Sequence, residues 1–257
     1  MKSIQSRDNP FFKELVKLSG SARQRGKANQ TLLDGTHLLA AYLDSGNQPR
    51  HILLNTAASH DGEIAGLLQR MTDVPVAQLD DKLFAELSEL KTPTGILALI
   101  DMPQPAVVPS SFALLLEDIQ DPGNLGSMLR SAAAAGCDAV FLSTGCADAW
   151  SPKVLRAAMG GHFALRIYER QSLTEVAKKF AGTLLAASLQ ATRSLYGCDL
   201  LGKIAFLVGN EGAGLSPALL NLATPITIPM PGKVESLNAA AATAICLFEV
   251  VRQRAAL

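Results

Sequence analysis

The sequence lacks the features that mark membrane and secreted proteins. None of its 257 residues lies in an apolar run long enough for a membrane-spanning helix, which needs roughly eighteen residues or more. The first residues, MKSIQSRDNPFF, contain no apolar stretch of the kind found in signal peptides. We therefore expect a cytoplasmic protein without membrane segments.

Cysteine is scarce, and two common nucleotide-binding patterns are missing. Cys137, Cys146, Cys198 and Cys246 form no CxxC pair, which argues against a zinc site or a disulfide framework. We expect reduced thiols and no metal. The sequence also contains neither a GxGxxG fingerprint nor a GxxxxGK[ST] loop. A nicotinamide-dependent dehydrogenase therefore loses its main support.

Charge is balanced overall but unevenly spread. The chain has 23 basic and 23 acidic residues. Residues 1–30 hold seven Lys/Arg against two acidic residues, a balance of +5, whereas residues 31–105 hold four against ten, a balance of −6. A basic arm indicates a polyanion partner, and it is equally typical of a solvated, lysine-rich helix. Charge alone leaves both interpretations open.

Apolar runs and helical patterns fall into two blocks. The first predicts a small α/β unit of roughly one hundred residues. It opens with a helix over 8–19, capped by Asp8 or Asn9 with Pro10 at its first position. The next segment, SARQRGKANQ, is polar and basic and predicts a mobile loop. Residues 101–109 contain three prolines and predict a linker.

The second block contains five nearly continuous apolar runs, which are typical of parallel strands covered on both faces. These runs are FALLLEDI, DAVFLS, GTLLAAS, KIAFLVGNEG and TPITIPMP. Helices are predicted between and after them, at 125–136, 151–160, 172–181, 215–223 and 236–254. The fold class is therefore α/β, and the proposed domains are 1–100 and 110–257, joined by the linker.

A single arginine marks the first candidate motif, EDIQDPGNLGSMLRSAAAAG. The predicted buried stripe of its helix comprises Leu125, Met128, Leu129 and Ala132. Arg130 lies off that stripe and can lean back over Gly126 toward the helix amino terminus, which favours an anion. The alternative is a surface arginine that pairs with Glu117 or Asp121.

Two later motifs are also candidates for a binding site. In FLVGNEGAGLS, glycines after a buried strand permit close approach of a ligand, and Glu211 is either functional or a capping residue. In TPITIPMPGKVESLNAAAATA, Ser236 is a natural helix cap. Asn238 would then sit in the first turn, where asparagine is a poor helix former, so it is a functional candidate. The alanines that follow permit close approach of another helix, within the chain or across a dimer interface.

Together these motifs resemble those of the SpoU (TrmH-type) RNA ribose 2′-O-methyltransferases of the SPOUT superfamily. The resemblance spans residues 112–254. Its three ordered motifs are Asn124-Leu-Gly126-Ser-Met-Leu-Arg130, Val208-Gly209-Asn210-Glu211-Gly212, and Ile228-Pro229-Met230-Pro231 followed by Ser236-Leu237-Asn238. Residues 1–100 look like the substrate-binding domain that often precedes this catalytic domain and is related to the ribosomal protein L30e fold.

The resemblance implies a trefoil knot at the carboxyl end of the parallel sheet, an exception to the general absence of knots. It also implies a homodimer through the second domain and S-adenosylmethionine as cofactor. The residues expected to hold the cofactor are Ser188, Leu189, Gly209, Ile228, Met230 and Leu237.

The same resemblance assigns residues to catalysis, and the charge distribution indicates the residues that contact RNA. Arg130 would grip the target nucleotide, Asn124 and Glu211 would order it, and Ser236 and Asn238 would fix the third loop. RNA capture would fall to the basic arm, namely Arg7, Lys17, Arg23, Arg25 and Lys27. Ribosomal RNA is favoured by family analogy. The alternatives are a transfer RNA 2′-O-methyltransferase and a catalytically silent RNA-binding protein of the same fold.

Overall fold

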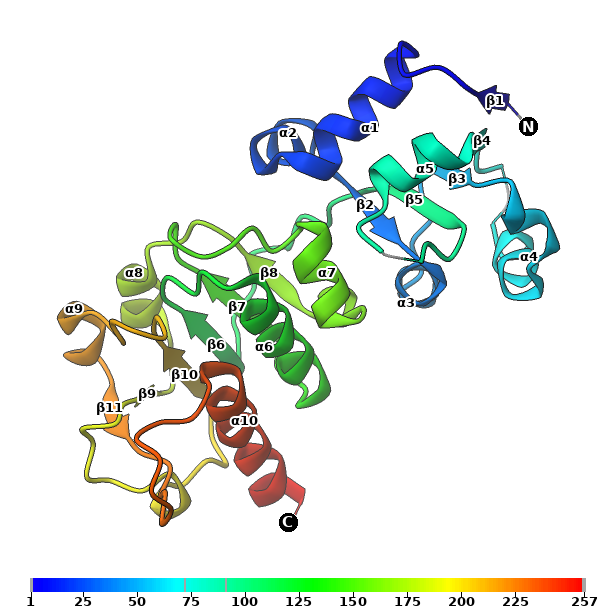
Figure 1. The fold of residues 1–257 in the computed structure, drawn as a ribbon. Coiled ribbons are helices and arrows are strands. Elements are labelled where there is room, and N and C mark those ends of the chain that lie inside the picture. Colours follow the sequence, from blue (N-terminus) through cyan, green and yellow to red (C-terminus); the bar gives the residue numbers. More distant parts are fainter. Residues whose placement is uncertain (1, 72, 91, 256–257) are drawn as a thin grey trace. The chain divides into compact units, whose positions relative to one another are not determined.

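The computed structural model describes residues 2–71, 73–90 and 92–255, and the chain forms two compact units (Figure 1). The first unit consists of Met1–Gln104 together with Trp150–Phe163. The second consists of Pro105–Ala149 together with Ala164–Leu257. The chain therefore passes from one unit to the other three times.

The first unit is built on a mixed five-stranded sheet with the order β1-β4-β3-β5-β2. β5 is antiparallel to both of its neighbours, and the other pairs are parallel. Its strands are β1 (Lys2–Ile4), β2 (Gln30–Asp34), β3 (His51–Leu54), β4 (Val76–Leu79) and β5 (Ile96–Asp101). Its helices are α1 (Pro10–Gly20), α2 (Ala22–Ala28), α3 (Thr36–Asp44), α4 (Gly62–Gln69), α5 (Asp81–Leu87) and α7 (Pro152–Ala158), with 3₁₀ turns η1 (Ala57–His60) and η2 (Gly161–Ala164), the latter ending where the second unit resumes.

The first helix begins as the sequence predicts. Asn9 is the cap of α1, and its side chain accepts hydrogen bonds from the Phe11 and Phe12 amides at 2.9 and 3.3 Å. Pro10 occupies the first position, where its missing N–H costs nothing. Phe12 and Leu15 on α1 and Phe84 on α5 pack into one apolar core over the sheet. The prediction for 8–19 is thus confirmed within two residues.

The segment SARQRGKANQ is a helix, so the prediction of a mobile loop is wrong. Ser21 caps α2 by accepting a hydrogen bond from the Gln24 amide, and Asn29 ends the helix in the left-handed conformation at φ 54°. Between these caps, alanine, arginine, glutamine and lysine all favour a helix. The loop was predicted from the polar composition of the segment, which does not reveal the capping residues at its two ends.

The helix α7 differs from the sequence-based domain division, because it packs in the first unit. It contacts β2, and the buried Thr31 hydroxyl donates a hydrogen bond to the Trp150 carbonyl at 2.8 Å. Phe163 meets Tyr42 edge to face at 5.1 Å between ring centroids. The division at 101–109 therefore describes one of the three crossings.

The second unit contains a six-stranded sheet, all parallel, with the order β11-β9-β10-β6-β7-β8. Its strands are β6 (Phe112–Leu116), β7 (Ala139–Leu142), β8 (Arg166–Tyr168), β9 (Thr183–Ala187), β10 (Ile204–Val208) and β11 (Thr224–Ile226). Its helices are α6 (Pro122–Ala134), α8 (Leu173–Lys179), α9 (Pro217–Leu220) and α10 (Ala239–Ala255), with a 3₁₀ turn η3 (Leu195–Gly197). The prediction of a parallel α/β domain is confirmed, and five of these strands coincide with the five apolar runs.

Helices cover both faces of this sheet. α6 and α10 pack side by side on one face (Figure 1), while α8 and α9 pack with the other face in a common apolar core. The predicted stripe of α6 is fully buried at Leu125, Met128, Leu129 and Ala132. Within the described ranges, none of the helices is long and apolar enough to cross a lipid bilayer.

Candidate active site

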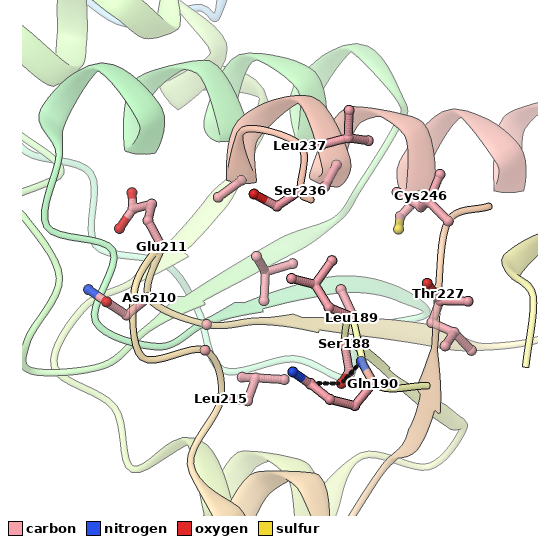
Figure 2. Close-up of a pocket in the computed structure, with 18 of the residues that line it drawn as sticks. Ser188, Leu189, Gln190, Asn210, Glu211, Leu215, Thr227, Ser236, Leu237 and Cys246 are labelled. Atoms are coloured by element: carbon pink, nitrogen blue, oxygen red, sulfur yellow. Dashed lines mark hydrogen bonds between the residues drawn. The ribbon is translucent and has the colours of Figure 1, made fainter. Parts of the chain in front are cut away.

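A pocket of about 580 Å³ opens at the carboxyl edge of the parallel sheet (Figure 2). Its walls come from the segments that follow three neighbouring strands, β9, β10 and β11, and from the start of α10. In Figure 2, Ser236 and Leu237 lie on the side of α10, and Ser188 and Gln190 lie on the opposite side. Because carboxyl ends of parallel strands meet at one edge, segments distant in sequence converge here.

All six residues expected to hold a cofactor line this pocket. They are Ser188, Leu189, Gly209, Ile228, Met230 and Leu237. Gly209 also shows why this position is glycine, because a Cβ there would lie 2.2 Å from the backbone of Gly214. The glycine loop can therefore fold back on itself only without a side chain at residue 209.

Hydrogen bonds join one side chain from each of the three motifs. The Asn124 amide nitrogen donates to Glu211 Oε1 at 2.8 Å, and the Asn238 amide nitrogen donates to Asn124 Oδ1 at 2.9 Å. Glu211, Ser236 and Asn238 line the pocket. Asn124, on the first turn of α6, connects two of them from outside it.

The prediction that Ser236 caps the last helix is wrong. α10 begins at Ala239, and Asn238 is the cap, since its Oδ1 accepts hydrogen bonds from the Ala240 and Ala241 amides at 2.9 and 3.1 Å. Asparagine is among the best residues at that position. Asn238 therefore obeys its local rule, and the argument that it breaks one does not hold.

Arg130 is exposed and forms no hydrogen bond or ion pair with any residue that the structure describes. The alternative pairing with Glu117 or Asp121 is not present. Glu117 Oε2 instead accepts from the Ser216 amide at 2.6 Å, and Asp121 Oδ1 accepts from the Asn124 amide at 2.7 Å. Arg130 does not line the pocket, and its guanidinium is available to a ligand.

The pocket also contains residues that the sequence did not single out. Gln190, Thr227 and Cys246 all line it. Burial, and next the neighbouring Cys198, raise the pKa of the Cys246 thiol to about 12, so it stays protonated and lines the pocket as a small apolar group. Two of them could have been found from their place in the sequence. Gln190 directly follows Leu189, which was expected to hold the cofactor, and Thr227 directly follows β11.

Four of the five residues expected to contact RNA are exposed on the first unit. Arg7 forms an ion pair with Glu86 at 2.7 Å, while Lys17, Arg23 and Lys27 have no ion pair with a described residue. Arg25 departs from the expectation. It is buried, and its guanidinium donates to the carbonyls of Leu18 and Ser19 at 2.6 and 3.0 Å. Those are orphan carbonyls at the end of α1.

Comparison with known proteins identifies the second unit. The model of the SpoU rRNA methylase family matches residues 111–248. The chain belongs to this family. Residues 9–98 match the MRM3-like substrate binding domain. The resemblance inferred from the three motifs is thus confirmed. The expected activity, that of an S-adenosylmethionine-dependent RNA ribose methyltransferase of the SPOUT type, is confirmed with it.

Relatives match the SpoU chain over nearly its whole length. One is the 23S rRNA (guanosine(2553)-2′-O)-methyltransferase RlmP of Bacillus subtilis, 34% identical, with 97% of this chain and 99% of the relative covered. Another is an uncharacterized tRNA/rRNA methyltransferase of Synechocystis, 35% identical, with 98% and 94% covered. Among solved structures, the SpoU methyltransferase AviRb of Streptomyces viridochromogenes in complex with AdoMet is 30% identical with a TM-score of 0.85, and 96% of this chain and 98% of that one are covered.

The pocket suits S-adenosylmethionine, the AdoMet of that complex. Its volume lies within the range of about 300–1,000 Å³ found for small-molecule sites, and its walls combine apolar side chains such as Leu215 and Leu237 with hydroxyl and amide groups. Glu211 is the one charged residue among those that line the described pocket. A carboxylate in a pocket with no lysine or arginine among its described lining residues favours a cationic sulfonium.

Proposed function

We propose that this protein transfers a methyl group from S-adenosylmethionine to the 2′-hydroxyl of a ribose in ribosomal RNA. The observation that supports the proposal is the hydrogen-bonded chain Glu211–Asn124–Asn238. It joins the first turn of α6, the helix that carries Arg130, to two residues that line a cofactor-sized pocket. A catalytically silent protein would have no need to keep this chain of bonds and the exposed Arg130 together.

When bound, S-adenosylmethionine supplies an electrophilic methyl group on its sulfonium. Ser188, Leu189, Gly209, Ile228, Met230 and Leu237 would hold it, as the lining of the pocket supports. Glu211 would stabilise its positive charge. Ser236 and Asn238 would keep the wall before α10 in place, and the bonds of Asn238 to Asn124 and to the helix support this role.

Arg130 would bind the phosphate of the target nucleotide and orient the 2′-oxygen. A guanidinium is effectively always protonated in proteins, so it cannot serve as the general base. Its contribution is electrostatic, because a fixed positive charge stabilises negative charge that develops on the attacking oxygen. The proton would leave to the phosphate or to water.

The first unit would capture the RNA. We propose Arg7, Lys17, Arg23 and Lys27 as phosphate contacts, since all four are exposed, and Arg25 is withdrawn because it is buried. The match of residues 9–98 to a substrate binding domain supports this assignment, as does the ribosomal RNA substrate in the name of the Bacillus relative. The trefoil knot and a cytoplasmic location stay predictions.

We also propose a homodimer through the second unit. Phe248 on α10 and Leu201, which precedes β10, are large apolar side chains that are 47% and 46% exposed. Small residues on α10 would permit a second helix to approach closely. Phe248→Lys should convert a dimer to monomers in light scattering, whereas Lys179→Gln, on α8 at the opposite face of the sheet, should leave the mass unchanged. A wild-type protein that is monomeric at micromolar concentration would contradict the proposal.

The decisive experiment is methyl transfer from labelled S-adenosylmethionine to ribosomal RNA, followed by mapping of 2′-O-methyl sites. Arg130→Ala should retain cofactor binding in calorimetry and lose roughly 10²- to 10³-fold in turnover, the scale for removing a preorganised electrostatic group. Lys203→Gln, which removes an exposed charge just before β10 at the amino edge of the sheet, is the matched control. Label that reaches transfer RNA alone, or no RNA, would refute the proposed function.

A further inference from the structure

The connection between β6 and α6, together with the first turn of α6, holds the glycine loop, residues 209–216, at three points. Glu117 Oε2 accepts from the Ser216 amide at 2.6 Å, and the Asp118 carbonyl accepts from the Asn210 side chain at 2.9 Å. The third point is the bond from Asn124 to Glu211 described above. The middle contact depends on the backbone conformation of a single residue.

Asp118 adopts the left-handed conformation, with φ 54°. This conformation is uncommon for a residue with a side chain, and it persists where the surroundings enforce it. Here Ser143 enforces it, because its hydroxyl accepts from the Asp118 amide at 2.9 Å and donates to Asp118 Oδ1. Ser143 directly follows β7, the strand that pairs with β6.

Gly145 completes the arrangement. A Cβ at residue 145 would lie 2.2 Å from Asp118 Oδ1, so the carboxylate occupies the space that a side chain would need. The loop that follows β7 thus fixes one residue, Asp118, that neither lines the pocket nor belongs to the three family motifs.

The Asn210 amide transmits this fixed geometry to the site. Its nitrogen is held by the Asp118 carbonyl, and its Oδ1 accepts from the Gly212 and Ala213 amides at 2.9 and 3.0 Å. The Asn210 carbonyl also accepts from the Gly214 amide at 2.9 Å. These bonds close the tight turn that carries Glu211.

We propose that Asp118 is a positioning residue for methyl transfer. Its left-handed backbone, held by Ser143 and Gly145, directs its carbonyl at Asn210 and so sets the position of Glu211 against Asn124. The expected effect on methyl transfer rests on the proposed function. The expected effect on the position of Glu211 rests on the backbone geometry alone.

Three substitutions in the full chain separate backbone from side chain. Asp118→Gly keeps the left-handed conformation and removes the carboxylate, while Asp118→Val disfavours that conformation, because a β-branched residue strains it. Gly145→Ala displaces the carboxylate. We expect Asp118→Val and Gly145→Ala to lower kcat by roughly ten- to a hundredfold, because small misplacements at a catalytic site are costly. Asp118→Gly should stay within about threefold of wild type, and KM for both substrates should change little in all three.

Arg170→Val is the matched control, because Arg170 is also left-handed, at φ 56°, follows β8 in the same unit, and has no bond to Asn210. It should lower the melting temperature without changing kcat. A double variant, Asp118→Val with Asn210→Ala, should be no slower than Asn210→Ala alone, since both remove the same bond.

Amide hydrogen exchange gives a measurement that does not depend on activity. The Gly212 and Ala213 amides should exchange faster in Asp118→Val than in wild type, Asp118→Gly or Arg170→Val. The inference is overturned if the exchange rates of these amides in Asp118→Val equal those in wild type. It is also overturned if kcat of Asp118→Gly is as low as that of Asp118→Val, or if the two substitutions of the double variant lower kcat additively. Wild-type protein that methylates no RNA would instead refute the proposed function, and the exchange result would still decide the geometry.

Discussion

Three asparagine side chains near the pocket each use both ends of one amide. The nitrogens of Asn124, Asn210 and Asn238 donate to Glu211, to the Asp118 carbonyl and to Asn124, respectively. Their oxygens accept from a side chain or from backbone amides. Ionised aspartate could replace only the accepting half, because it has no donor. At the scale of residues, the site is therefore specified by amide orientation as much as by charge.

Asn238 allows its two functions to be separated. Asn238→Ser keeps a capping oxygen and loses the bond to Asn124, whereas Asn238→Ala loses both. We expect Asn238→Ala to cost about 1 kcal/mol of unfolding free energy, and Asn238→Ser to restore most of that stability without restoring turnover. Thermal denaturation and methyl transfer measured on the same preparations test this, and serine-variant turnover equal to wild type would exclude a role for the Asn124 bond.

Several of these residues could be found from sequence because glycine, proline and asparagine stand out at strand ends. Glu211 and Asn238 were named from their local patterns and Asn124 from the family resemblance, and the structure brings the three together. The reason given for Asn238 was wrong, because the start of α10 lies three residues beyond Ser236, and capping depends on that boundary. Asp118 was not singled out, since a φ angle leaves little trace in composition.

At the scale of elements, apolar continuity was a reliable guide and polarity was not. The two central strands found from apolar runs, β6 and β10, are buried at every position, so their sequences had to be apolar throughout. β8, with the sequence Arg-Ile-Tyr, was missed because it is a short edge strand with one buried residue. α2 was missed because its stability depends on capping and on Arg25 rather than on an apolar stripe.

Arg23 and Arg25 lie two residues apart and should behave in opposite ways. Arg25→Met removes charged hydrogen bonds to the end of α1 and should lower the unfolding free energy by about 2 kcal/mol, with the salt dependence of RNA binding unchanged. Arg23→Gln should leave stability unchanged and reduce the slope of log affinity against log salt by roughly 0.7–0.9 if it contacts one phosphate. If the two variants reduce that slope equally, Arg25 contacts RNA and the assignment made here is wrong.

At the scale of the whole molecule, the path of the chain differs from the order of its domains in sequence. Trp150–Phe163 leaves the second unit, contributes α7 to the first, and returns. No local sequence pattern predicts that residues 150–163 belong to the first unit, because a helix that follows a strand has the same pattern whichever unit it packs against. The contacts that reveal it join residues more than a hundred positions apart, such as Thr31 and Trp150.

A fragment of residues 1–104 should therefore be incomplete. It lacks α7, whose Val154, Leu155 and Ala158 are buried, and it leaves the Thr31 hydroxyl without the Trp150 carbonyl. We expect the fragment to bind a hydrophobic dye and to melt without a sharp transition. Residues 1–104 joined by a flexible linker to 150–163 should melt cooperatively. A sharp transition in the shorter fragment would show that α7 is dispensable.

The three crossings have a consequence for how such proteins can be recombined. Two domains joined by a single linker can be exchanged by one cut, and each keeps its own fold. Here an RNA-capturing unit taken from a relative would have to bring its own residues 150–163, spliced into the middle of the recipient's catalytic sequence. If the first unit captures RNA, as proposed above, the residues that select the substrate lie in two separate stretches of the chain. A chimaera that transplants only the amino-terminal stretch would combine the donor's sheet with the recipient's α7.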